Sequence, residues 1–132
     1  MDFNKSIYEN RIEKSSPLLA AHRGVCGANI PCNPLAAFKI AVDQGADVVE
    51  IDVAKSKDGK YYVFHPGMER AFLKSDRRIK EMTSEEVEAL VLVNQDDVPT
   101  SYKIPTLAEV YALMSERGLY VNVEIKDSGK DF

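Results

Sequence analysis

Two segments of the chain alternate acidic and apolar side chains. Glu50 and Asp52 do so within VVEIDV, and Glu124 does so within YVNVEIK. In a β-strand successive side chains point to opposite faces, so Glu50 and Asp52 share one face, about 6.5–7 Å apart along the strand. Carboxylates converging from neighbouring strands repel one another, and a hard divalent cation such as Mg²⁺ or Ca²⁺ relieves that repulsion. Glu50, Asp52 and Glu124 are therefore candidate metal ligands.

The same pattern has a second interpretation. Acidic alternation is common on half-exposed strands, where the carboxylates are solvated or paired with nearby lysines, here Lys55 and Lys126. The pattern alone leaves both interpretations open.

Histidines end two other apolar segments. His22 and Arg23 follow the run PLLAA, and His65 follows YYVF. A histidine titrates near neutral pH and can exchange a proton with a substrate, whereas arginine carries a permanent charge. Each histidine taken alone is more often structural than catalytic, so the functional interpretation depends on the whole set of residues.

The elements that must position these residues can be predicted from local signals. A strand is expected at 17–22, followed by a helix that Asn33 caps and in which Pro34 takes the first position. A second strand is expected at 47–56. An Asp58–Gly59 hairpin turn should then lead to a returning strand at 61–65. Residues 67–81 are expected to form a loop. A helix capped by Thr83 and Glu86 should run to about Leu92, a loop should cover 94–105, a helix should follow Thr106, and a strand is expected at 119–126.

This order favours an α/β fold. Strands that alternate with helices are typical of parallel sheets joined by right-handed crossovers. Active sites of parallel barrels lie at the carboxyl ends of the strands, where His22 and the acidic residues stand. Only three main strands are present, so we expect the chain to be a piece of a larger barrel or sheet, with open strand edges that promote self-association.

Composition narrows the functional classes. The chain has 132 residues, enough for one domain, and a net charge of −4, which does not suggest a nucleic-acid partner. It has no apolar run long enough for a transmembrane segment, and its polar start resembles no signal peptide. We therefore expect a cytoplasmic protein, with export left open if an upstream signal has been removed. The two cysteines, Cys26 and Cys32, are expected to be free thiols.

Several motifs together resemble the glycerophosphodiester phosphodiesterase family. They are HRG at 22–24, PCNPLAAFKIAVDQGADVVEIDVAKSKDG at 31–59, VFH at 63–65, IPTLAEV at 104–110 and VNVEIK at 121–126. The resemblance implies a TIM-type (β/α)8 barrel, of which this chain covers about the first half. Residues 1–16 would then be a polar lead-in, and residues 17–132 the amino-terminal part of the barrel domain.

The resemblance also implies roles for single residues. His22 and His65 match the catalytic acid–base pair, Arg23 and Lys126 the phosphate contacts, and Glu50, Asp52 and Glu124 the ligands of a divalent metal, Mg²⁺ or Ca²⁺. The implied reaction is hydrolysis of a small-molecule glycerophosphodiester to sn-glycerol 3-phosphate and an alcohol. The isolated 132-residue chain is expected to be inactive.

Two departures from the family pattern leave alternatives open. The family's Pro-Glu-Asn-Thr is Pro-Cys-Asn-Pro at 31–34, and its His-Asp is His65-Pro66, so two carboxylates near the site are absent. One alternative is a barrel that has lost catalysis and binds a phosphorylated ligand or partner. Another is a related enzyme acting on phospholipids or sugar phosphodiesters.

Overall fold

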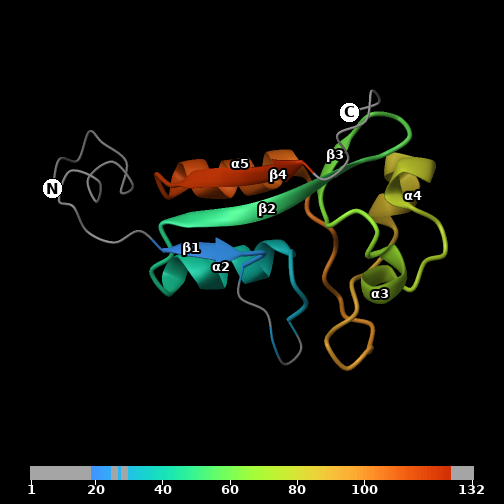
Figure 1. Ribbon diagram of the computed structural model, residues 1–132, viewed down its shortest axis with the longest axis horizontal. Helices are drawn as coiled ribbons and strands as arrows, with labels where there is room; N and C mark the ends of the chain where they lie inside the picture. Colours follow the sequence, from blue (N-terminus) through green and yellow to red (C-terminus); the bar gives the residue numbers. More distant parts are fainter. Residues whose placement is uncertain (1–18, 25–26, 28–29, 126–132) are drawn as a thin grey trace, which may run out of the picture.

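The centre of the molecule is the strand β2 (Val48–Lys55), which pairs with every other strand of a four-stranded sheet. The computed structural model describes residues 19–24, 27 and 30–125. The strands β1 (Ala20–His22) and β4 (Tyr120–Ile125) run parallel to β2, and β3 (Tyr61–Val63) is antiparallel to it (Figure 1). The strands expected at 47–56 and 119–126 are thus present, although Lys126 lies outside the described residues.

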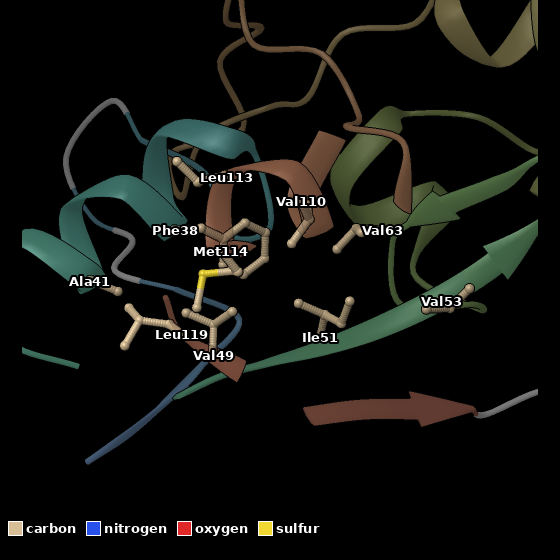
Figure 2. Packing of buried hydrophobic residues seen from close by; sticks show 10 residues of the cluster. All are labelled: Phe38, Ala41, Val49, Ile51, Val53, Val63, Val110, Leu113, Met114 and Leu119. Atoms are coloured by element: carbon tan, nitrogen blue, oxygen red, sulfur yellow. The ribbon is translucent and has the colours of Figure 1, made fainter. Parts of the chain in front are cut away.

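One face of the sheet is covered by two helices, α2 (Leu35–Asp43) and α5 (Leu107–Glu116). Val49, Ile51 and Val53 point from β2 toward these helices, because alternate residues of a strand share a face (Figure 2). The helices contribute Phe38, Ala41, Val110, Leu113 and Met114 to this core. The acidic residues between the three β2 side chains are therefore directed to the opposite face.

Two strands share one edge of β2. The Arg23 N–H donates to the Glu50 carbonyl and the Phe64 N–H donates to the Asp52 carbonyl, both at 3.0 Å. Carbonyls two residues apart point to the same side of a strand, so the ends of β1 and β3 follow one another along this edge. The fold thereby brings His22 and His65, the residues that follow Ala21 and Phe64, to neighbouring stretches of β2.

The segment 67–81 is ordered, contrary to the expected loop. It forms the helix α3 (Glu69–Leu73) and a 3-10 turn, η1 (Ile79–Glu81). The buried Glu69 carboxylate accepts hydrogen bonds from the N–H groups of Gly67 at 2.8 Å and Ile79 at 3.2 Å. These bonds organise the segment, and local patterning does not reveal them.

The helices α3 and α4 (Ser84–Glu88) lie beyond β3 (Figure 1). A second apolar cluster includes Leu73 of α3, Ile79 of η1 and Val87 of α4. The expected capping box is present in α4, since the Thr83 hydroxyl accepts from the Glu86 N–H. The helix ends at Glu88, however, and does not continue to Leu92. The Leu92 N–H instead donates to the Tyr102 carbonyl at 2.9 Å, so pairing with the following loop ends the helix.

Other local expectations are confirmed or shifted. Gly59 has a φ of 91° in the hairpin turn, and the Thr106 hydroxyl accepts from the Glu109 N–H at the start of α5. The residue that caps α2 is Pro34, because Asn33 has a φ of 75° and stands one residue outside the helix. The returning strand ends at Val63, two residues earlier than expected.

The first strand is less buried than its apolar sequence suggests. Within the described part of the chain, β1 pairs only with β2, and Leu19 before it is 56% exposed. An edge strand keeps one side open unless another segment covers it.

Two further expectations concern membrane segments and cysteines. Among the described residues, no helix is long and apolar enough to span a bilayer.

Cys32 is disulfide-bonded, so the expectation of a free thiol is wrong there, and Cys26 lies outside the described residues. The expectation rested on the cellular compartment, which carries no information about the distance between thiols.

Candidate active site

His22 is positioned by the pairing of β1 with β2. The parallel register places His22 beside Glu50, and the two side chains project from the same face. The His22 Nε2 lies 3.4 Å from the Glu50 Oε2. The His22 side chain is 67% exposed while that of Glu50 is 14% exposed, so the histidine lies over the carboxylate on its solvent side.

Arg23 turns back across the sheet at the end of β1. Its φ of 56° is a left-handed conformation, and its Nε lies 3.0 Å from Asp52 Oδ2. This contact is an ion pair, because its angles are not those of a hydrogen bond and both atoms remain without a hydrogen-bond partner. Arg23 thereby compensates part of the charge of Asp52, whose side chain is fully buried.

Glu124 reaches the same place from β4. The register aligns Asp52 with Glu124 and Glu50 with Asn122. One ligand atom from each of Glu50, Asp52 and Glu124 lies within 4.8 Å of the others. The tertiary fold thus brings together the three carboxylates that the strand pattern predicts on one face.

The proximity of these carboxylates changes their acidity. Burial raises the pKa of the Glu50 carboxyl to about 7, and a hydrogen-bonding contact with the Glu124 carboxyl and the charge of Asp52 act in the same direction. The Arg23 guanidinium acts in the opposite direction. Two carboxyls can hydrogen-bond only while one of them is protonated, so this contact favours the protonated form of Glu50.

The buried oxygens of this cluster suit a cation. Both carboxylate oxygens of Glu50 and both of Asp52 are buried and, apart from the carboxyl contact just described, have no hydrogen-bond partner among the described residues. Buried charged oxygens without a partner are costly, and an oxygen-binding divalent ion would satisfy them. The donor set of three carboxylates therefore fits Mg²⁺ or Ca²⁺.

The two remaining predicted site residues are His65 and Lys126, and the structure describes only His65. His65 follows β3 on the same edge of β2 as β1, and its Nδ1 lies 2.9 Å from the Pro66 carbonyl oxygen. A carbonyl can only accept, so Nδ1 donates and the Nε2 of the neutral ring is left as an acceptor. No contact between His65 and the carboxylates is found among the described residues, and Lys126 lies outside them.

Sequence reasoning assigned Asn33 only a capping role. The residue is 1% exposed, both polar atoms of its side chain are buried without a partner, and its N–H donates to the Arg23 carbonyl at 3.1 Å. The asparagine before a proline gives a local signal for a turn, but nothing in the sequence indicates the burial of its amide.

Comparisons with known proteins identify the family of the chain. The model of the glycerophosphoryl diester phosphodiesterase family matches residues 22–132. A glycerophosphodiester phosphodiesterase from Caldanaerobacter subterraneus is 37% identical over 110 residues, which are 83% of this chain and 45% of the relative. Another from Bacillus altitudinis is 34% identical, over 82% of this chain and 44% of the relative.

Solved structures give the same result. A phosphodiesterase from Oleispira antarctica in complex with the product sn-glycerol-3-phosphate is 32% identical, with a TM-score of 0.72 over 86% of this chain and 46% of its own. A glycerophosphoryl diester phosphodiesterase from Parabacteroides distasonis is 25% identical, with a TM-score of 0.73 over 99% of this chain and 42% of its own.

These likenesses confirm the expected fold class. The α/β arrangement with its parallel strands corresponds to part of a TIM-type barrel, and the chain spans a little under half the length of the relatives it matches. With residues 22–132 matched by the family model, the chain belongs to the glycerophosphoryl diester phosphodiesterase family.

Proposed function

We propose that this chain is the amino-terminal part of a metal-dependent phosphodiesterase that hydrolyses a glycerophosphodiester to sn-glycerol 3-phosphate and an alcohol. The observation that carries the proposal is the cluster of Glu50, Asp52 and Glu124, with ligand atoms within 4.8 Å of one another, beside His22 and Arg23. The product bound by the Oleispira antarctica phosphodiesterase supports the assignment of the substrate class.

The carboxylates would hold the divalent ion, Mg²⁺ or Ca²⁺. When bound, the ion supplies positive charge against the negative charge that develops on the phosphoryl group. Arg23 extends this positive charge on one side, because its guanidinium already lies against Asp52 and its remaining N–H groups can donate to phosphate oxygens. Lys126 would contribute a further cation.

The two histidines would move the protons of the reaction. Water attacks phosphorus, the bond from phosphorus to the alcohol oxygen breaks, and the proton lost by water is balanced by the proton gained by the leaving alkoxide. Either histidine can accept the first proton while the other donates the second. In His65 the Pro66 carbonyl fixes the Nδ1 proton, which leaves Nε2 to exchange a proton with substrate.

The test uses the complete protein that contains this chain. Glycerophosphocholine is supplied with Mg²⁺ or Ca²⁺, and release of sn-glycerol 3-phosphate is followed with a coupled dehydrogenase. We expect turnover that a chelator abolishes, that Asp52→Asn removes, and that Asp43→Asn leaves intact, because Asp43 pairs with Arg117 at the exposed end of α2.

A panel of substrates separates the alternatives. Turnover of phospholipids or sugar phosphodiesters, with none of glycerophosphodiesters, would contradict the proposed substrate class. Binding of sn-glycerol 3-phosphate without turnover of any diester would show a barrel that has lost catalysis, which is the outcome that the absent carboxylates at Cys32 and Pro66 would explain.

A further inference from the structure

Buried side-chain polar atoms without a hydrogen-bond partner are confined to four side chains in the described part of the chain. They are atoms of Arg23, Asn33, Glu50 and Asp52. Three of these residues belong to the candidate site, where a ligand and a cation would complete their contacts. Asn33 has no such role so far, yet its amide oxygen and nitrogen are left unpaired at a cost to stability. A polar group kept buried and unsatisfied in a native protein needs an explanation.

Asn33 is tied to the phosphate-contact candidate by the backbone. Its N–H donates to the carbonyl of Arg23 at 3.1 Å, which closes the connection from β1 to α2. Both residues adopt left-handed conformations, with φ of 56° for Arg23 and 75° for Asn33. Non-glycine residues held in this region are strained, and such strain concentrates at binding and catalytic sites.

The start of α2 adds a second group that favours an anion. The helix has nine residues, its N-cap Pro34 gives no side-chain hydrogen bond, and its first turn holds no acidic residue. In the described part of the chain, no acceptor is found for the N–H groups of Leu35 and Ala36. Gly24 packs against this first turn, because a Cβ on Gly24 would lie 2.7 Å from the Ala37 carbonyl carbon. The positive end of the helix therefore adjoins Arg23 and Gly24.

We propose that the Asn33 amide and the first-turn N–H groups of α2 bind the phosphate group of the ligand together with Arg23, so that Asn33 is a ligand-binding residue of this site. The inference rests on the proposed function, since it assigns Asn33 to the same phosphate. The amide supplies a neutral donor that suits an anionic oxygen. Its polar atoms are as covered as the oxygens of Glu50 and Asp52.

The first experiment measures binding in the complete protein without added metal. Inorganic phosphate is titrated while NMR follows the side-chain amide of Asn33 and the backbone amides of Leu35 and Ala36. We expect these signals to shift together with those of Arg23 and with one dissociation constant. Shifts at Arg23 without shifts at Asn33 and at the start of α2 would overturn the proposal.

Two variants test the side chain itself. Asn33→Gly retains the backbone N–H and suits a φ of 75°, so we expect a melting temperature no lower than that of the parent and phosphate affinity about tenfold weaker. Asn33→Asp keeps the shape and adds a negative charge, so its affinity should fall further. Phosphate affinity within twofold of the parent in either variant would overturn the proposal.

A matched control separates the site from general effects. Asp97→Gly removes the side chain of another left-handed residue, with a φ of 62°, at an exposed turn that pairs with Lys74. This variant should bind phosphate as the parent does.

Phosphate binding and diester hydrolysis test the two proposals separately, because phosphate binding needs no turnover. A parent protein that binds phosphate through Asn33 but hydrolyses no diester would contradict the proposed function and support this inference. If the parent protein hydrolyses the glycerophosphodiester, Asn33→Gly should raise KM for that substrate more than it lowers kcat.

Discussion

At the scale of single residues, the candidate site combines enclosed negative charge with the guanidinium of Arg23. Asp52 is fully buried and has Arg23 as its ion-pair partner, while Glu50 is nearly enclosed and has a pKa raised to about 7 by burial and by its acidic neighbours. Protons or a divalent cation would lower the mutual repulsion of these carboxylates.

The histidines are expected to carry catalysis rather than binding. In the complete protein, His22→Ala and His65→Ala should each lower kcat about 10²-fold or more, the usual scale of acid–base catalysis, with a smaller change in KM. The measurement is steady-state turnover of glycerophosphocholine at saturating metal. Near-normal turnover in either alanine variant would show that the residue has another role.

At the scale of elements, the connection from β1 to α2 depends on a close backbone approach. Gly24 has a φ of 78°, and a Cβ at this position would lie 2.7 Å from the Ala37 carbonyl carbon and 2.8 Å from its oxygen. Both neighbours are backbone atoms, which cannot rotate away as the end of a side chain can. The helix start can approach the end of β1 only because residue 24 has no side chain.

Gly24→Ala should therefore lower the free energy of unfolding by more than about 2 kcal/mol, through left-handed strain and steric overlap together. Gly45→Ala is the matched control, since Gly45 has a φ of 99° but no atom lies within 4 Å of the place that a Cβ would occupy. It should cost about 1 kcal/mol, from strain alone. Denaturant titration of the complete protein measures both, and equal losses would contradict the packing argument.

At the scale of the whole molecule, the sheet has open sides within the described part of the chain. There, β1 and β4 each pair only with β2, and Leu19, Tyr120 and Ile125 are 56%, 48% and 51% exposed. A closed barrel would cover such edges, and the chain spans 45% of its relative from Caldanaerobacter subterraneus.

The isolated 132-residue chain is expected to self-associate and to show no appreciable phosphodiesterase activity. Exposed strand edges and apolar side chains drive association, and a pocket without its remaining wall admits water freely. Sedimentation velocity at micromolar concentration measures the association state, and an assay on the same sample measures phosphodiesterase activity. A compact and active monomer would contradict both expectations.

Features that depend on neighbouring residues could be predicted from the sequence. The alternation in VVEIDV and YVNVEIK is sufficient to place Glu50, Asp52 and Glu124 opposite the apolar face, and it agrees with the observed register. The Asp58–Gly59 turn and the cap at Thr83 were also predictable, because each depends on a few adjacent residues.

Only the tertiary structure decided which groups meet across the fold. The ion pair between Arg23 and Asp52, the burial of the Asn33 amide and the bonds from Glu69 that order the segment 67–81 all join parts of the chain that local patterns treat separately. The end of α4 was misjudged for the same reason, since Leu92 pairs with Tyr102. The sequence determined the residue types of the site and the strands that carry them. Their charge balance arises from distances that exist only after the strands have paired.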